Sequence, residues 1–344
     1  MTELIDLETP YLLFLGEAES LLSAKTAGGV AHWRPERCLA QLRLPGAKAD
    51  LGLPDMSIAD AAAAGAKTFV IGIAPIGGRL PEAWESLCVE ALEAGMDIAS
   101  GLHSRLGAIP ALAEAARRSG RRILDVREPP PDLPCGTGER RPGKRLLTVG
   151  TDCCVGKMFA ALAIEAELRK RGVDADFRAT GQTGILIAGS GIAVDAVVAD
   201  FLSGSVEVLA PANDPEHWDL IEGQGSLFHP AYAGVSLGLL HGAQPDALVL
   251  CHEAGRTYID DDEEAGFPLP SLEHAIAANL EAARLTNPDV AMAGIALNTS
   301  NLSDDEAQAL LADLSRQHGV PAVDPVRTGV AAIVDRLEPS LCVA

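Results

Sequence analysis

The sequence feature that most constrains the fold of this chain is a glycine-rich loop at residues 150–158, which lies between an apolar segment and a helical run. Residues 146–149 form a short apolar strand, and an amphipathic Ala/Leu/Glu-rich run behind the loop ends at Gly172. Backbone N–H groups converge in such a loop, and the helix dipole adds positive potential. Lys157 would add a point charge for a phosphate. The sequence therefore predicts a phosphate-binding loop that consists of Gly150, Thr151, Asp152, Cys153, Cys154, Val155, Gly156, Lys157 and Met158.

The residue after the lysine argues against ATP hydrolysis. Five residues separate Gly150 from Gly156, one more than in the strict P-loop motif. Met158 stands where that motif has Ser or Thr, and a thioether cannot replace the hydroxyl that holds Mg²⁺. We therefore expect phosphate binding here without nucleotide hydrolysis.

Length, charge and cysteine pattern exclude several classes of protein. A chain of 344 residues is long enough for two domains, and its net charge of −21 disfavours a nucleic-acid partner, because such a protein has to neutralise phosphates. No apolar run reaches the about 18 residues of a membrane span, and the N-terminus has no signal-peptide pattern. The seven cysteines show no disulfide framework, so we expect reduced thiols in a cytoplasmic protein. We also expect no membrane partner and a homo-oligomer.

Strands and helices alternate along both halves of the chain. In the first half we predict a loop at residues 25–29 and strands at residues 11–15, 30–34, 38–42, 68–71, 96–100 and 122–126. Strands that alternate with helices predict parallel sheets with right-handed crossovers. Residues 127–144 are rich in proline and glycine, which favours an extended linker. The predicted fold class is α/β, with an N-terminal Rossmann-like domain (1–134), a linker (135–144) and a C-terminal P-loop NTPase-like doubly wound domain (145–344).

Polar side chains follow each predicted strand of the second domain. These strands are expected at residues 175–179, 218–221, 247–251 and 290–297, and ligands of parallel sheets bind at the carboxyl ends of strands. We therefore expect one cleft to collect these side chains. The candidates at these ends are Arg178, Gln182, Thr183, Glu222, Gln224, His252, Arg256 and Asn298.

Three further positions have competing interpretations. His229 follows the Glu222-Gly-Gln-Gly225 turn closely and is either a functional imidazole or a structural one. Asp200, on a helix predicted at residues 192–202, is either functional or part of a solvated face. The acidic run at residues 260–264 is expected to be a solvated loop.

Two families share motifs with this chain. Gly150-Thr-Asp…Val-Gly-Lys157 and Glu222-Gly-Gln-Gly225 resemble the phosphate loop and a strand end of dethiobiotin synthetase, and Asn298 resembles the adenine-reading asparagine of that family. A resemblance over nearly the whole chain is to a family long known as a domain of unknown function, DUF1611. The motifs that carry it are Gly-Ile-Ala-Pro-Ile-Gly-Gly-Arg79-Leu-Pro, Ser-Gly-Leu-His103, Gly150-Thr-Asp-Cys-Cys-Val-Gly-Lys-Met158 and Glu-Gly-Gln-Gly-Ser-Leu-Phe-His-Pro-Ala-Tyr232.

The DUF1611 resemblance implies an activity. Members of that family include D-glutamate N-acetyltransferases, which use acetyl-CoA and act beside an N-acetylglutamate racemase. The implied reaction needs a base for the substrate ammonium, donors for the thioester oxyanion and cations for two carboxylates, but no metal. Glu222 or His229, with Asp200 next, is the expected base; backbone N–H groups of residues 223–225 or 181–183 are oxyanion candidates. Arg79, Arg178 and Arg256 are the expected partners of the substrate carboxylates.

Two other functions remain open at this stage. One is an ATP- and Mg²⁺-dependent ligase or synthetase, in which Asp152, Asp200 or Glu222 would hold the metal. The other is a non-catalytic nucleotide-binding regulator.

Overall fold

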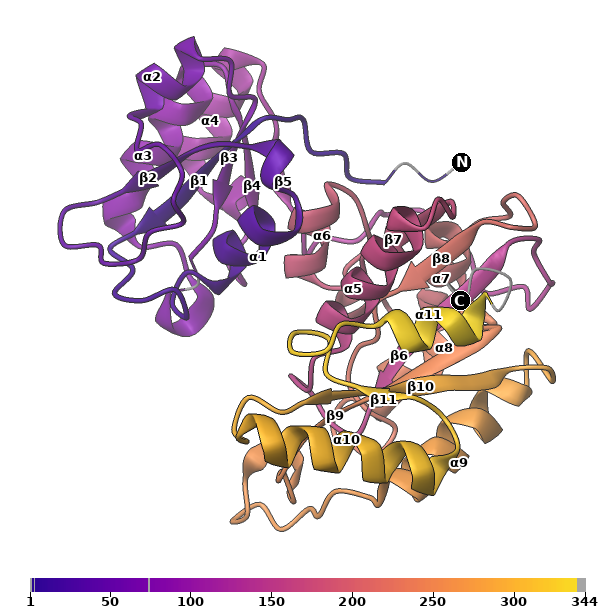
Figure 1. Cartoon of the computed structure of the whole chain (residues 1–344). Helices are drawn as coiled ribbons and strands as arrows, with labels where there is room; N and C mark the ends of the chain where they lie inside the picture. Colours follow the sequence, from indigo (N-terminus) through magenta and orange to yellow (C-terminus); the bar gives the residue numbers. More distant parts are fainter. Residues whose placement is uncertain (1, 3, 74, 339–344) are drawn as a thin grey trace. The chain divides into compact units, whose positions relative to one another are not determined.

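The chain forms two α/β units, each with an entirely parallel sheet (Figure 1). The computed structural model describes residues 2, 4–73 and 75–338. The first unit contains Met1–Pro131 together with Gly181–Ala196, and the second contains Asp132–Thr180 together with Val197–Ala344. Two parallel sheets confirm the α/β prediction. The predicted domain boundaries stay a prediction, and the contacts add that residues 181–196 pack with the first unit.

The first unit is built on a five-stranded sheet in the order β2-β1-β3-β4-β5. Apolar residues fill its strands, and β1 and β3 are buried along their whole length. The strands are β1 (Tyr11–Gly16), β2 (Cys38–Arg43), β3 (Thr68–Ile71), β4 (Asp97–Ser100) and β5 (Ile123–Asp125). The helices of this unit are α1 (Lys25–Trp33), α2 (Ile58–Ala63), α3 (Glu82–Glu93), α4 (Pro110–Ser119) and α6 (Gln182–Ala188).

Helix α1 corrects two predictions from the sequence. The loop at residues 25–29 and the strand at residues 30–34 were both wrong, because this segment is one helix. The N–H of Ala27 donates to the carbonyl of Gly72, and the small residues let α1 approach its neighbours closely. A Cβ on Gly29 would lie 3.4 Å from Ile187 of α6. Tertiary packing therefore overrides the low helix propensity of the two glycines.

The segment between α6 and α7 (Leu202–Leu209) is not the continuous helix predicted at residues 192–202. It contains two short 3₁₀ turns, Val194–Ala196 and Ala199–Phe201. The chain passes from the first unit to the second between Ala196 and Val197, inside the segment that was predicted as a helix. Asp195 forms an ion pair with Arg127, and both residues belong to the first unit. This ion pair holds the end of residues 181–196 on the first unit.

The second unit is built on a six-stranded sheet in the order β11-β10-β9-β6-β8-β7. β6 therefore lies between β9 and β8, and its end is flanked by both of their ends. The strands are β6 (Lys144–Gly150), β7 (Ala175–Arg178), β8 (Trp218–Ile221), β9 (Ala247–Glu253), β10 (Ala291–Asn298) and β11 (Ala322–Val323). Besides α7, the helices are α5 (Lys157–Lys170), α8 (Ala233–Ala243), α9 (Leu272–Arg284), α10 (Asp304–His318) and α11 (Ala331–Leu337).

The proline- and glycine-rich stretch at residues 135–144 is fixed to the second unit. Glu207 accepts hydrogen bonds from the backbone N–H groups of Thr137 and Gly138, at 2.9 and 3.0 Å. Arg141 donates to the carbonyls of Ala210 (3.0 Å) and Gly242 (2.7 Å). These contacts anchor the stretch to α7 and to the end of α8.

Two expectations from composition can be compared with the described residues. No helix among them is long and apolar enough to cross a membrane. Their six cysteines are free thiols, whereas Cys342 lies outside the described residues.

Candidate functional site

The predicted phosphate loop connects β6 to α5, in the middle of the second sheet. Gly156 precedes the first residue of α5 and has φ +99°, a conformation that glycine adopts without the strain a side chain would cause. Lys157 then begins the helix. The strand–loop–helix arrangement predicted from the sequence is therefore confirmed, and the helix N-terminus faces the loop as an anion site requires.

Lys157 is buried and bonded within the loop. Its side-chain ammonium donates to the backbone carbonyl of Asp152 at 2.6 Å, and the residue is 7% exposed. Burial lowers the pKa of this ammonium, because the charged form loses its hydration. The loop thus provides an oxygen partner for the lysine, and a phosphate oxygen is a partner of the same kind.

The side chain of Asp152 is fully buried and holds the loop to the segment after β9. Its Oδ1 accepts the N–H of Cys153 (2.7 Å), and its Oδ2 accepts the N–H of Asp260 (2.6 Å) and the guanidinium of Arg256 (2.9 Å). Arg256 also pairs with Glu253 at 2.7 Å. The arginine predicted to bind a substrate carboxylate therefore supports the phosphate loop.

The turn after β8 is pressed against β6. The N–H of Gly223 donates to Thr148 Oγ1 (2.9 Å), and a Cβ on Gly223 would lie 1.7 Å from the carbonyl oxygen of Thr148. Only glycine fits at this distance. Ser226 Oγ donates to the carbonyl of Thr151 (2.9 Å), which holds the phosphate loop from this side. Because the Gly223 N–H already has an acceptor, it is engaged in the fold rather than presented to an oxyanion.

Glu222 and Gln224 both contact Thr180, which lies two residues before the start of α6. Oε2 of Glu222 accepts the N–H of Thr180 (2.9 Å), and the Glu222 carbonyl accepts the Thr180 hydroxyl (2.7 Å). Gln224 Nε2 donates to the same hydroxyl at 3.2 Å. Glu222 is 4% exposed, so its carboxylate is buried just after the end of β8.

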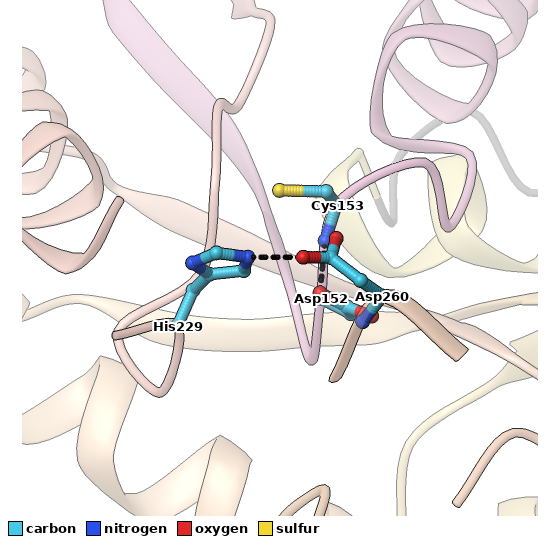
Figure 2. A group of neighbouring side chains, drawn as sticks. All are labelled: Asp152, Cys153, His229 and Asp260. Carbon is cyan, nitrogen blue, oxygen red and sulfur yellow. Dashed lines mark hydrogen bonds and ion pairs between the residues drawn. The ribbon is translucent and has the colours of Figure 1, made fainter. Parts of the chain in front are cut away.

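His229 has both ring nitrogens engaged, and Figure 2 shows the contact of one of them with Asp260. Nδ1 accepts the backbone N–H of Ala231 (3.1 Å), so Nε2 carries the proton and donates it to Asp260 Oδ2 (3.0 Å). Neither nitrogen offers a lone pair to a substrate in this arrangement. Asp260 and the neighbouring acidic residues are exposed as predicted, but Asp260 has φ +57° and also contacts Asp152 and His229.

His252 lies beside the loop as a neutral imidazole. Its Nδ1 is 2.9 Å from Thr151 Oγ1. Burial, and then the charge of Arg256, lowers its pKa to about 4. A histidine with this pKa is uncharged at neutral pH, so it orients the loop threonine and supplies no cation to a carboxylate.

A pocket of about 200 Å³ borders the other end of the phosphate loop. Cys154, Gly156 and Phe159 line one part of it, and the end of β10 with Asn298 lines another. Oδ1 of Asn298 accepts the N–H of Ser300 (3.1 Å), which fixes the orientation of the amide and leaves its NH₂ group as a donor. The complete lining is Cys154, Val155, Gly156, Phe159, Ala296, Leu297, Asn298, Asp324, Pro325 and Val326.

The remaining predicted residues lie away from the phosphate loop or in the other unit. The guanidinium of Arg178 turns back along the sheet to Asp219 (2.6 Å) and Asp176 (3.3 Å), because these buried and half-buried carboxylates are its nearest partners. Asp200 is exposed in a 3₁₀ turn. The first unit contains Arg79, which is exposed, and Gln182 and Thr183 at the start of α6. The roles of all these residues stay predictions.

Of the residues around the loop, sequence reasoning missed Thr148, Ser226 and Asp260. Thr148 and Ser226 are single hydroxyls without a motif of their own, and Asp260 lies in a run of similar acids. Only the approach of β8 and β9 to β6 shows that these three residues are neighbours of the loop.

Fold and site define a two-domain α/β protein with a P-loop domain behind a Rossmann-like domain. Sequence models of the DUF1611 family match both parts: its Rossmann-like N-terminal domain at residues 42–129, and its P-loop domain, described as a domain of unknown function, at residues 134–334. The chain belongs to the DUF1611 family.

Several relatives match over nearly the whole chain. A D-glutamate N-acetyltransferase of Tritonibacter scottomollicae is 51% identical, covering 96% of this chain and 99% of the relative. A D-glutamate N-acetyltransferase of a Pseudoalteromonas species is 50% identical, covering 97% and 100%. The crystal structure of a DUF1611 protein from Anabaena variabilis superposes with a TM-score of 0.80 at 33% identity, covering 96% of this chain and 98% of that chain.

The environment of His252 generates a prediction about pH. The pKa of His252 is 6.5 in the unfolded protein and about 4 in the folded protein. As the pH falls, the unfolded protein therefore binds this proton at a higher pH than the folded protein does. Its contribution to stability is therefore present above pH 6.5 and is lost as the pH falls towards 4. The loss is at most about 3 kcal/mol. The thermal midpoint of the wild type should fall more steeply between pH 7 and pH 4 than that of His252→Gln.

All other titrating groups are the same in the wild type and in His252→Gln, so the difference between their thermal midpoints reports on His252 alone. His274→Gln, at an exposed position, is the matched control and should follow the wild-type profile. Parallel profiles for the wild type and His252→Gln would show that His252 titrates normally in the folded protein.

Proposed function

We propose that this protein transfers an acetyl group from acetyl-CoA to the amino group of D-glutamate. The observation that carries the proposal is the identity of 51% and 50%, over nearly full length, to two D-glutamate N-acetyltransferases. Both units of this chain are covered by that identity, so the whole architecture of those enzymes is present. The product, an N-acetyl amino acid, is a substrate for the racemase that the family resemblance implies.

The phosphate loop suits the polyphosphate part of coenzyme A. The N-terminus of α5 and the Lys157 ammonium form an anion site, and Lys157 exchanges the Asp152 carbonyl for a phosphate oxygen when the coenzyme binds. Met158 provides no hydroxyl for Mg²⁺, which disfavours the alternative of an ATP-dependent ligase. Acetyl transfer requires no phosphoryl chemistry, so the loop has only to bind.

The pocket beside the loop suits the adenine ring. Phe159 and the apolar end of β10 offer surfaces for stacking, and the NH₂ group of Asn298 offers a donor to a ring nitrogen. The pocket shares Cys154 and Gly156 with the phosphate loop, so one nucleotide can occupy both. In this proposal the loop binds the phosphates and Asn298 reads the base.

Glu222 is the proposed general base. D-Glutamate arrives as an ammonium ion, which has no lone pair for attack on the thioester, so one proton has to leave first. The Glu222 carboxylate is buried and accepts the N–H of Thr180, but a carboxylate has about four lone pairs and can still take up a proton. The two ring nitrogens of His229 are engaged with Ala231 and Asp260. The amine then attacks the acetyl carbonyl, a C–N bond forms, and the thiolate of coenzyme A leaves and takes up a proton.

Of the three arginines predicted as partners of the substrate carboxylates, Arg79 remains the proposed one, and Gln182 and Thr183 remain proposed substrate-binding residues. Arg79 is exposed, whereas Arg178 and Arg256 are held in ion pairs with Asp219 and Asp152.

A homo-oligomer is also part of the proposal. The oligomeric state is measured by light scattering during gel filtration.

Thiol release tests the proposed function. Purified protein with acetyl-CoA and D-glutamate should release free coenzyme A, detected with a chromogenic thiol reagent, and form N-acetylglutamate, detected by mass spectrometry. Because the chemical step uses no metal, turnover at saturating acetyl-CoA should persist after treatment with EDTA. Product that forms only with ATP and Mg²⁺ would replace this proposal with a ligase.

Lys157→Ala should weaken the binding of acetyl-CoA and leave that of D-glutamate nearly unchanged. Loss of one charge-assisted contact costs about 1.5–3 kcal/mol, which lowers affinity roughly tenfold to a hundredfold. The measurement is the KM for each substrate, with direct titration of acetyl-CoA. Lys170→Ala, in the last turn of α5, is the matched control. An unchanged acetyl-CoA affinity in Lys157→Ala would mean that the loop binds no phosphate.

Glu222→Gln distinguishes a general base from a side chain that only accepts the hydrogen bond of the Thr180 N–H. Glutamine keeps an oxygen that accepts the Thr180 N–H but cannot take a proton, so kcat should fall about 10²–10⁴-fold while acetyl-CoA still binds. His229→Asn, measured at saturating acetyl-CoA, should keep most of its turnover. The reverse result would make His229 the base, and full turnover in both variants would move the assignment to Asp200.

A further inference from the structure

Four potential metal ligands from three separate segments meet beside the phosphate loop (Figure 2). Asp152 and Cys153 belong to the loop, His229 to the turn after β8 and Asp260 to the turn after β9. One ligand atom of each residue lies within 4.8 Å of those of the other three. Asp152 and His229 are buried, Cys153 is half-buried and Asp260 is exposed, so an ion can reach the group from solvent on the side of Asp260.

We propose that Asp152, Cys153, His229 and Asp260 bind one divalent transition-metal ion, of which Zn²⁺ is the preferred example. A sulfur, an imidazole nitrogen and two carboxylate oxygens are the mixed ligand set that Zn²⁺ accepts in tetrahedral geometry. Mg²⁺ and Ca²⁺ prefer oxygen ligands alone, so the thiol and the imidazole select against them.

Local charge gives an independent reason for a cation here. Asp152 belongs to the loop, Asp260 contacts Asp152, and Glu253 pairs with Arg256, which contacts Asp152 as well. These three carboxylates stand against two cations, Lys157 and Arg256. The balance of two positive and three negative charges is −1, which opposes the approach of a polyphosphate. A divalent ion shared by Asp152 and Asp260 reverses this sign.

Binding requires defined rearrangements of protons. The thiol proton of Cys153 leaves to solvent as the sulfur–metal bond forms. His229 has to coordinate through Nε2, so its proton moves from Nε2 to Nδ1, and the hydrogen bond from Ala231 to Nδ1 is lost. Ala231 is exposed, so its N–H turns to water at little cost. Asp152 Oδ1 accepts one hydrogen bond and keeps a lone pair for the ion.

The ion takes no part in the acetyl transfer. It joins the phosphate loop to the turns after β8 and β9, and it makes the loop more attractive to phosphate. This last step rests on the proposed function, because it concerns acetyl-CoA. Metal binding itself does not, and it is measured without any substrate.

Metal binding is tested on the full-length protein after dialysis against a chelator. Zn²⁺ is titrated by calorimetry and in competition with a chromogenic chelator, and one ion per chain is expected. Co²⁺ is the spectroscopic probe: thiolate ligation adds a charge-transfer band in the near ultraviolet to the visible bands of a low-symmetry site. Cys153→Ser should lose the near-ultraviolet band and keep the visible bands.

Matched variants locate the ion. Cys153→Ser, Asp260→Asn and His229→Asn should each weaken Zn²⁺ binding by about tenfold or more. Cys154→Ser and Asp261→Asn change the adjacent thiol and the adjacent carboxylate and should bind as the wild type does. Asparagine tolerates the left-handed backbone of residues 260 and 261, and circular dichroism checks that each variant is folded. Absence of binding by the wild type, or equal affinity in all five variants, would overturn the site.

A second titration tests the effect on the coenzyme. Acetyl-CoA is titrated into metal-free and Zn²⁺-loaded protein, and the loaded form should bind it at least several-fold more tightly. Equal affinities would overturn the electrostatic role and leave the metal site standing. A protein that binds Zn²⁺ but transfers no acetyl group would overturn the proposed function alone, so the two failures are distinguishable.

Discussion

The hydrogen bond from the Lys157 ammonium to the carbonyl of Asp152 is the interaction on which the site depends. A buried ammonium is costly unless an acceptor replaces the lost water. The acceptor is the Asp152 carbonyl of the loop itself, so the loop has to turn back towards the first turn of α5. The left-handed backbone conformation of Gly156 allows this reversal of the chain. A ligand oxygen that replaces the carbonyl therefore releases Asp152 from Lys157.

Asp152 connects that release to the rest of the site. Its carboxylate is held by Arg256 and by the N–H of Asp260, and Asp260 is in turn held by His229. The phosphate loop, the turn after β8 and the turn after β9 therefore form one hydrogen-bonded network. A small displacement of Asp152 is expected to shift Asp260 and, through it, His229, although Asp152 and His229 lie on separate segments. The same network explains why Arg256 and His229 serve the loop rather than a substrate.

The sequence predicted the parts of this structure that depend on local pattern. The strand–loop–helix around Gly156 and Lys157 follows from short-range apolar periodicity and glycine placement, and it is confirmed. Features that depend on long-range packing were missed. Helix α1 contains two glycines, Gly28, which faces Leu51, and Gly29, which faces α6, and α6 itself packs with the first unit. Arg178 was predicted from its place at a strand end, but nothing in the sequence shows that Asp219 would draw it back.

The absence of a hydroxyl at Met158 and the proposed cation site beside the phosphate loop are related by charge. A nucleotide hydrolase places its Mg²⁺ between a loop hydroxyl and phosphate oxygens, because the ion has to act on the bond that breaks. An acyltransferase breaks a bond far from the phosphates and needs positive charge there only for affinity. A cation held by Asp152, Cys153, His229 and Asp260 has protein ligands alone, so it can remain while the coenzyme enters and leaves. The loop can therefore dispense with the hydroxyl and still attract a polyphosphate, although the charged side chains in and around it sum to −1.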